Sequence, residues 1–311
     1  MRLLSLTVTA AWICLGLFAC SSPAPSSTPD HEDGLISVNG TRLFVHREGA
    51  GEPAIVIHGG PLLDHTYLQP YLAPLGDELE LIFYDQRLSG RSDGVVESTS
   101  VRLDTFVDDI EALREALGLE RVHLIAHSWG ALLAMKYAVS YPDRLRSLML
   151  LDPMAPTAAL WREEERALAA SLAPQDTAGA GALRATEAFA AREPAAMKAV
   201  LRHSFRSQFR DRALSEELTF HIGDDYLERS RQFGFMIGDL STFDLMEALR
   251  DVKVPTLVLY GEDEPGVSIG GDAIREAIPR AQHVTIPDTG HFPFVEQPEA
   301  FLHAVRGFLA R

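Results

Sequence analysis

The chain contains little cysteine, and this scarcity excludes several kinds of site. Only two cysteines occur in 311 residues, Cys14 and Cys20, and both lie within the first 20 positions. The remainder of the chain therefore has no thiol for a disulfide or a zinc site. The histidines have no metal-ligand spacing either, so we expect no metal and no cofactor.

Positive charge is also scarce. Lysine and arginine together number 28 against 44 aspartates and glutamates, which gives a formal net charge of −16. Binding to nucleic acid requires clustered positive charge, so we expect no nucleic-acid partner. The acidic balance favours solubility instead.

A long apolar run occurs at the N-terminus. Arg2 precedes apolar residues 3–19, and this pattern predicts a secretory signal peptide over 1–19, too short for a confident membrane span. The sequence Leu-Phe-Ala-Cys at 17–20 resembles a bacterial lipobox, which implies a lipid on Cys20 and attachment to the cell envelope. Because Phe18 is larger than the residue usual there, a soluble periplasmic or secreted protein is the alternative. The Pro/Ser-rich segment 20–33 would then be a flexible tether.

Short apolar runs alternate with helical patterns through most of the chain. This alternation predicts a mostly parallel, doubly wound sheet with helices on both faces. We expect strands within 35–48 (a hairpin at Asn39-Gly40), 53–57, 79–84, 121–126, 145–151, 255–260 and 283–286, and helices at 64–76, 103–117, 130–140, 269–278 and 298–309.

The alternation stops after the sixth strand, which ends before Asp152. Residues 154–238 are rich in alanine and arginine and show helical patterns only. We predict a core over 34–153 and 239–311 with a helical cap over 154–238. Because open α/β sheets bind ligands at the carboxyl ends of their strands, the cap is expected to shape the substrate pocket.

The junction of a predicted strand and helix at 126–130 reads Ala-His-Ser-Trp-Gly. A serine at such a junction, with small residues two before and two after it, is typical of a nucleophile elbow. The tight turn exposes Ser128 Oγ at the sheet edge, and the start of the helix offers N–H groups to an oxyanion. Ser128 is therefore the predicted nucleophile.

A serine nucleophile needs a base, an acid and an oxyanion hole. In the order serine, acid, histidine, His291 is the predicted base because it follows the last strand. The acid is expected after the preceding strand, where Glu262, Asp263 and Glu264 lie. The backbone N–H groups of Gly60 and Trp129 are the predicted oxyanion hole.

Four motifs resemble the proline iminopeptidase-like (serine aminopeptidase) branch of the α/β-hydrolase superfamily. They are His-Gly-Gly-Pro at 58–61, Asp-Gln-Arg-Leu-Ser-Gly-Arg-Ser at 85–92, His-Ser-Trp-Gly at 127–130 and Gly-His at 290–291. Their order and their positions at strand ends make the resemblance specific. The chain departs from the branch at Ala126, Leu62, Leu63 and Leu88, where the branch often has glycine.

The resemblance places the acid three residues after the strand-end glycine, which here is Glu264. Ser-His-Glu triads are an accepted variant. Asp263 is the second candidate and Asp152 the third, because some members of the superfamily carry the acid after the earlier strand.

The resemblance implies a serine hydrolase that cleaves an N-terminal residue, for instance proline, from short peptides through an acyl-enzyme. A carboxylesterase acting on small esters is the alternative, and a non-catalytic binding protein of the same fold is an alternative of another class. Haloalkane dehalogenases and epoxide hydrolases use aspartate at the position of Ser128, which argues against both.

Several neighbouring residues are expected to have supporting roles. His127 is expected to point away from the pocket, His58 to support its loop, and Asp85 and Arg87 to form a charged pair. The acidic cap residues are expected on solvated faces, although an aminopeptidase would need one or two of them for the α-ammonium group of its substrate. Those residues are Glu163, Glu164, Glu165, Asp224, Asp225 and Glu228.

Overall fold

The computed structural model describes residues 33–94 and 97–311. The predicted signal peptide, nearly all of the predicted tether and the candidate lipid site Cys20 lie outside the described residues. Among the helices that the structure describes, none combines the length and hydropathy needed to cross a membrane.

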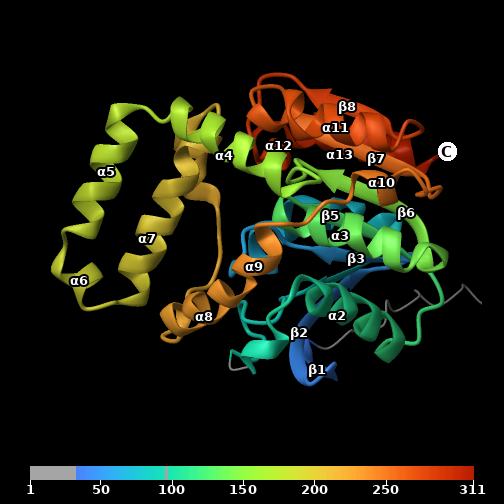
Figure 1. The fold of residues 1–311 in the computed structure, drawn as a ribbon, viewed down its shortest axis with the longest axis horizontal. Coiled ribbons are helices and arrows are strands. Elements are labelled where there is room, and N and C mark those ends of the chain that lie inside the picture. The colour runs from blue at the N-terminus through green and yellow to red at the C-terminus, as the bar shows by residue number, and fades with distance from the viewer. Residues whose placement is uncertain (1–32, 95–96) are drawn as a thin grey trace, which may run out of the picture. The chain divides into compact units, whose positions relative to one another are not determined.

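Eight strands form one sheet in the order β1-β2-β4-β3-β5-β6-β7-β8 (Figure 1). The two pairings that involve β2 are antiparallel, and all the others are parallel. The strands are β1 (Gly34–Val38), β2 (Thr41–Gly49), β3 (Glu52–Ile57), β4 (Leu79–Tyr84), β5 (Val122–His127), β6 (Leu145–Leu151), β7 (Thr256–Gly261) and β8 (Gln282–Ile286). The predicted mostly parallel sheet is confirmed.

Helices cover both faces of the sheet, and the strand residues divide between them by alternation. In β5, Leu124 and Ala126 face the apolar cluster under α2 and α3, whereas Ile125 faces the cluster under α12 and α13. The α-helices are α1 (Gln69–Leu72), α2 (Leu103–Ala116), α3 (Trp129–Ser140), α4 (Ala158–Ser171), α5 (Pro174–Arg184), α6 (Glu187–Ala190), α7 (Pro194–Phe205), α8 (Tyr226–Phe233), α9 (Ile237–Leu240), α10 (Met246–Leu249), α11 (Gly270–Ala277), α12 (Pro293–Glu296) and α13 (Pro298–Leu309).

One predicted helix is wrong in detail. In place of a continuous helix over 64–76, the structure has a 3-10 turn at His65–Tyr67, the short α1, and a second 3-10 segment at Ala73–Asp77. Pro70 and Pro74 explain the breaks, since proline has no N–H for the helical ladder and restricts the residue before it.

The chain between β6 and β7 carries α4 to α10, and the helices α4 to α9 form the helical insertion that was predicted after the sixth strand. Its two ends meet at an isolated bridge between Thr157 and Asp244, beside which the Ala158 N–H donates to the Phe243 carbonyl oxygen. The inserted segment also contacts the sheet-edge loops, because the His221 N–H donates to Asp64 Oδ2 at 2.8 Å. These contacts fix the insertion over the strand ends.

Candidate active site

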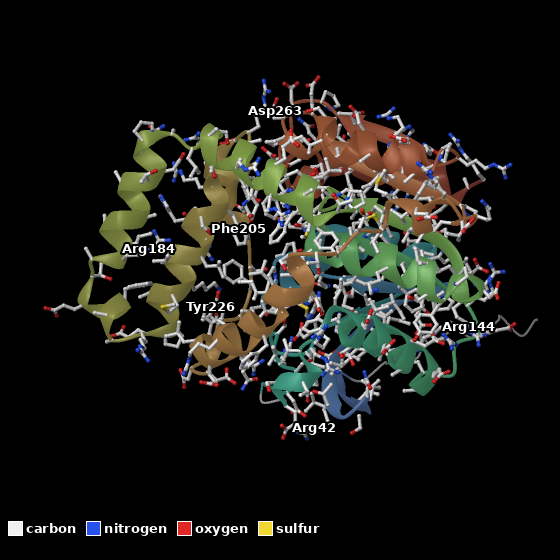
Figure 2. All side chains as sticks on the ribbon, in the orientation of Figure 1. Arg42, Arg144, Arg184, Phe205, Tyr226 and Asp263 are labelled. Carbon is white, nitrogen blue, oxygen red and sulfur yellow. The ribbon has the colours of Figure 1, made fainter. Side chains whose placement is uncertain are left out.

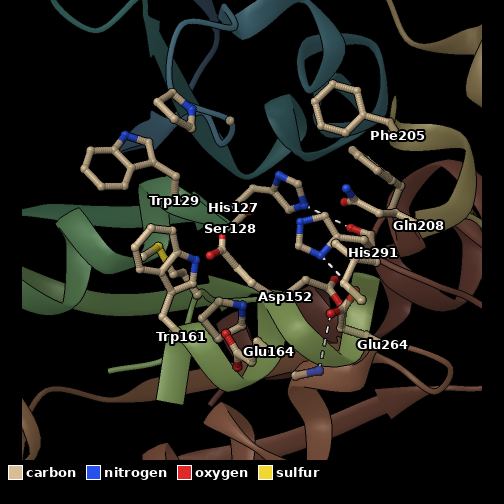
Figure 3. Close-up of a pocket in the computed structure, with 18 of the residues that line it drawn as sticks. His127, Ser128, Trp129, Asp152, Trp161, Glu164, Phe205, Gln208, Glu264 and His291 are labelled. Carbon is tan, nitrogen blue, oxygen red and sulfur yellow. Dashed lines mark hydrogen bonds and ion pairs between the residues drawn. The ribbon is translucent and has the colours of Figure 1, made fainter. Parts of the chain in front are cut away.

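Ser128 lies in the sharp turn between β5 and α3. Its backbone angles, φ 55° and ψ −118°, are unusual for a residue with a side chain. Hydrogen bonds hold the strained turn, because the Ser128 N–H donates to Leu151 O and the Ser128 carbonyl accepts from Ala131 and Met154. The half-exposed side chain has no hydrogen-bonding partner among the described residues and faces a cavity (Figure 3).

The two small residues that flank the elbow tolerate different changes. A Cβ on Gly130 would lie 2.5 Å from the His58 carbonyl oxygen and 2.6 Å from that of Ile57. Ala126 lies in β5, fully buried, and its methyl group packs within the apolar core. The close approach of the carbonyl groups at the end of β3 to α3 therefore requires glycine at 130, whereas the core around position 126 accommodates a methyl group.

Gly60 and Trp129 border the same cavity as Ser128. Neither backbone N–H has a hydrogen-bonding partner in the described part of the chain. Gly60 has a φ of 48°, and a Cβ there would lie 2.6 Å from the Leu63 side chain. The Trp129 indole is buried and donates to Gln86 Oε1 at 2.8 Å, which fixes the ring.

His291 and Glu264 form an ion pair at the cavity, with His291 Nδ1 3.0 Å from Glu264 Oε2. Glu264 Oε1 also accepts from the Gly266 N–H at 3.3 Å, which orients the carboxylate. Burial lowers the pKa of His291, but the charge and hydrogen bond of Glu264 outweigh it and raise that pKa overall. Burial likewise raises the pKa of Glu264, and the His291 charge reverses this so that the net shift is downward.

Asp152, the third candidate acid, lies close to this pair. Ligand atoms of Asp152, Glu264 and His291 all fall within 4.8 Å of one another, a spacing that could also hold a metal ion. Asp152 Oδ1 accepts from the Gly261 N–H at 2.9 Å, but Oδ2 is buried without a partner in the described residues. Burial raises the pKa of Asp152 well above its usual range, whereas the pKa of Glu264 is shifted downward.

Asp263, the second candidate acid, points elsewhere. Its Oδ2 pairs with Arg210 Nη1 at 2.6 Å, and the side chain is 42% exposed. Figure 2 shows Asp263 at the outer surface of the fold. Among the three candidates, Glu264 is the one hydrogen-bonded to His291.

The cavity has a volume of about 320 Å³ and lies between the sheet edge and the cap. Aromatic and aliphatic side chains form most of its wall, and Figure 3 shows Trp161 and Phe205 of the cap beside it. Its lining consists of Gly60, Pro61, Leu63, Tyr67, His127, Ser128, Trp129, Asp152, Pro153, Met154, Trp161, Glu164, Glu165, Leu168, Phe205, Gln208, Leu240, Glu264, Gly266, His291 and Phe292.

Glu164 departs from the predicted solvated face. It lines the cavity, and its two carboxyl oxygens accept from the backbone N–H groups of Ala155 at 3.0 Å and Gly270 at 3.1 Å. Burial raises the pKa of Glu164 to about 8, and the nearby charge of Glu264 adds to the increase. Glu165 also lines the cavity. The other four acidic cap residues, Glu163, Asp224, Asp225 and Glu228, lie outside the lining.

The prediction for His127 is wrong. Its ring does not point away but lies in the cavity wall, with its centroid 4.8 Å from that of His291. Tyr67 Oη lies 2.7 Å from His127 Nδ1, and His127 Nε2 lies 2.9 Å from the His291 carbonyl oxygen. Alternation along an ideal strand misled the prediction, because β5 ends at His127 and the strained turn begins there.

The charged pair predicted between Asp85 and Arg87 is also wrong. Asp85 Oδ1 lies 2.7 Å from His65 Nδ1, and Arg87 makes two hydrogen bonds to Asp109 on α2. The side chains of Asp85 and Arg87 reach different partners, and each partner is at least 20 positions away in the sequence. His58 supports its loop as predicted, since its Nε2 accepts from the Gln86 N–H.

Leucine replaces the glycine that the branch often has at three positions, and at two of them the backbone is left-handed. Leu62 has a φ of 76° and Leu88 a φ of 66°. That conformation costs about 1–2 kcal/mol for a residue with a Cβ. Both side chains are buried in the apolar cluster under α2 and α3, so burial offsets the strain.

The chain belongs to the α/β-hydrolase fold family, whose model matches residues 53–298. It is 28% identical over 289 residues to a proline iminopeptidase of Heyndrickxia coagulans, covering 90% of this chain and 99% of that protein. A proline iminopeptidase of Clostridium botulinum is also 28% identical, with coverage of 86% and 93%.

Solved structures give the same result. The crystal structure of a proline iminopeptidase from Mycobacterium smegmatis matches with a TM-score of 0.68 and 26% identity, over 90% of this chain and 98% of that one. A proline iminopeptidase-related protein from Thermus thermophilus gives 0.67 and 26%, with coverage of 90% and 97%. The predicted fold class and the resemblance to proline iminopeptidases are confirmed.

Proposed function

We propose that this protein is a serine aminopeptidase that removes an N-terminal residue, such as proline, from short peptides. The observation that carries the proposal is the grouping of Ser128, His291 and Glu264 at one cavity, which is also lined by two residues whose backbone N–H groups have no partner among the described residues. The similarity to proline iminopeptidases over nearly the whole chain supports the substrate class.

In the proposed reaction, Ser128 Oγ attacks the carbonyl carbon of the scissile bond and its proton passes to His291 Nε2. Glu264 accepts the hydrogen bond from His291 Nδ1–H and stabilises the imidazolium. The N–H groups of Gly60 and Trp129 receive the oxyanion. His291 then protonates the leaving amine, and a water molecule hydrolyses the acyl-enzyme.

The α-ammonium group of a peptide needs an anionic partner, and Glu164 is the cap residue that we assign to it. Two backbone N–H groups hold its carboxylate at the cavity wall, and no cationic side chain pairs with it among the residues described. A bound ammonium group would supply that missing charge, because an opposite charge nearby favours the ionised carboxylate.

Labelling with a fluorophosphonate probe tests the nucleophile. The wild-type chain should react covalently, and Ser128→Ala should not react. A wild-type protein that stays unlabelled would favour the non-catalytic binding protein, and equal labelling of both proteins would contradict the role of Ser128.

Substrate comparison tests the leaving group. We expect the enzyme to hydrolyse prolyl β-naphthylamide with a kcat/KM above that for a p-nitrophenyl ester without an α-amine. Rapid ester hydrolysis beside negligible amide hydrolysis would reject the aminopeptidase and support the carboxylesterase alternative.

We further propose export, with a lipid on Cys20 that anchors the chain to the bacterial cell envelope. The support is the sequence alone: an apolar run over 3–19 followed by Leu-Phe-Ala-Cys. Cells that express the full chain should incorporate labelled palmitate into it, and processing should be sensitive to globomycin. Label that persists in Cys20→Ser would overturn the lipid site.

A further inference from the structure

Three buried groups form a hydrogen-bonded chain behind the candidate active site. The Gly59 N–H donates to Tyr67 Oη at 2.6 Å, and Tyr67 Oη lies 2.7 Å from His127 Nδ1. His127 Nε2 lies 2.9 Å from the carbonyl oxygen of His291. Tyr67 is 1% exposed and His127 is 2% exposed, so water does not compete for these contacts.

The partners determine which atom donates at each step. Burial lowers the pKa of His127 well below its usual value, and the nearby His291 lowers it further, so the ring is neutral. A neutral imidazole has one N–H, which must be on Nε2 because that atom faces a carbonyl oxygen. Nδ1 is then an acceptor, and the Tyr67 hydroxyl donates to it.

The two ends of this chain belong to different parts of the proposed machinery. Gly59 immediately precedes Gly60, whose N–H is assigned to the oxyanion hole. His291 is the assigned base, and its loop follows β8 far along the sequence. The ring of His127 is also tightly enclosed, because a Cβ on Gly59 would lie 2.7 Å from Nδ1.

We propose that His127, together with Tyr67, is a positioning residue that couples the oxyanion loop at Gly59-Gly60 to the loop of His291. Both ring nitrogens of His127 have partners within this chain, so the residue acts on the reaction through the two loops. The pair of residues fixes the position of the base His291 relative to the oxyanion donors near Ser128. The inference rests on the proposed serine mechanism and adds to it a residue pair outside the triad.

Tyr67→Phe tests the proposal with a minimal change, since it removes one hydroxyl and leaves two buried polar groups unpaired. We expect kcat and the rate of fluorophosphonate labelling to fall about 10²-fold, as for a misplacement of about 1 Å, with KM unchanged. Tyr137→Phe is the matched control: Tyr137 is fully buried and donates to Glu111 Oε2 away from the cavity. It should lose stability with its kcat unchanged.

Two conservative variants of His127 separate the two links. His127→Gln keeps an amide N–H near the place of Nε2, and His127→Asn keeps an acceptor near the place of Nδ1. Adding Tyr67→Phe to His127→Gln should lower kcat little further, because both changes break the same link. Adding Tyr67→Phe to His127→Asn should lower kcat further, because the asparagine variant still accepts from the Tyr67 hydroxyl.

The outcomes distinguish this proposal from the proposed function. A wild-type chain that the fluorophosphonate does not label would remove the serine mechanism itself. If the wild type is labelled and Tyr67→Phe matches Tyr137→Phe in kcat and melting temperature, His127 and Tyr67 serve packing alone and the coupling is wrong.

Discussion

The carboxyl edge of the sheet and the cap wall opposite it hold their buried charges differently. At the sheet edge two buried charge pairs are present, His291 with Glu264 and Arg87 with Asp109. On the cap wall, the partners of Glu164 within residues 33–94 and 97–311 are backbone N–H groups, and burial raises its pKa to about 8. The charge pairs of the core are therefore complete without a ligand, whereas the cap carries a carboxyl that a bound cation would help to ionise.

The largest expected effect is at the sheet edge itself. Ser128→Ala removes the proposed nucleophile, so kcat should fall by about 10⁴-fold or more. KM should change little, because the cap and the cavity wall remain. Steady-state assays with prolyl β-naphthylamide measure both constants, and a kcat within tenfold of the wild type would contradict the assignment.

The next prediction compares the carboxyls near His291. Glu264→Gln keeps the shape of the side chain but removes the charge, so kcat should fall about 10³-fold or more. Asp152→Asn should cost far less, because the amide keeps the oxygen that accepts from the Gly261 N–H. Asp263→Asn is the exposed control and should leave kcat unchanged.

The pH dependence gives a second measurement of the same pair. Activity needs neutral His291, and Glu264 raises the pKa of that histidine, so kcat/KM is lost as pH falls through the raised value. Glu264→Gln should lower that pKa and move the acid limb of the profile to lower pH. A limb that moves with Asp152→Asn instead would make Asp152 the acid.

The sequence identified some residues of the site and could not distinguish others. The strand ends and the motif residues Ser128, Gly60 and His291 were predicted because turns and loops at a parallel sheet edge follow local patterns. Glu264 was preferred over its neighbour only through the family resemblance, since adjacent carboxylates look alike in sequence. The structure shows that Glu264 faces His291 and Asp263 faces Arg210.

Contacts between distant segments were the part that sequence could not supply. Glu164 stands in an acidic run whose members look equivalent, and only the approach of the Ala155 and Gly270 backbones distinguishes it. The link from His127 to Tyr67 spans 60 positions. A tyrosine in a segment interrupted by prolines gave no local signal of that role.

The cap side of the comparison is tested by Glu164→Gln. We expect KM for prolyl β-naphthylamide to rise about 10- to 100-fold, because a charge-assisted hydrogen bond to the α-ammonium group is lost. KM for an ester without an amine should stay unchanged, and kcat should change little for either substrate. Glu163→Gln, outside the cavity, is the matched control.

The pH dependence of kcat/KM tests the same role of Glu164. In the free enzyme Glu164 loses its proton as pH rises through about 8, which favours ammonium binding. The α-amine of the substrate loses its own proton in the same range, near 7.7–8.0. The wild-type kcat/KM for the amine substrate should therefore peak near pH 8. If Glu164→Gln and wild type give the same profile and the same KM, this carboxylate does not bind the amine.

The smallest effect is expected where the cap meets the loops of the sheet edge at the surface. Arg210 of the cap segment pairs with Asp263 at 2.6 Å and with Asp288 at 3.0 Å, but all three side chains are at least 42% exposed. Exposed ion pairs contribute little and are screened by salt. Arg210→Ala should therefore change kcat less than about twofold at 0.15 M salt.

Hydrogen bonds to backbone groups also join the cap segment to the loop of His291. Glu296 accepts from the N–H groups of Gly290 and Asp211, and the His291 N–H donates to the Gln208 carbonyl oxygen at 2.8 Å. Since backbone contacts hold the cap segment against the His291 loop, Glu296→Gln should lower kcat more than Arg210→Ala does. Stopped-flow acylation rates at low and high salt compare the two variants. If Arg210→Ala lowers the acylation rate more than Glu296→Gln does, and the loss depends on salt, surface ion pairs hold the cap segment at the site instead.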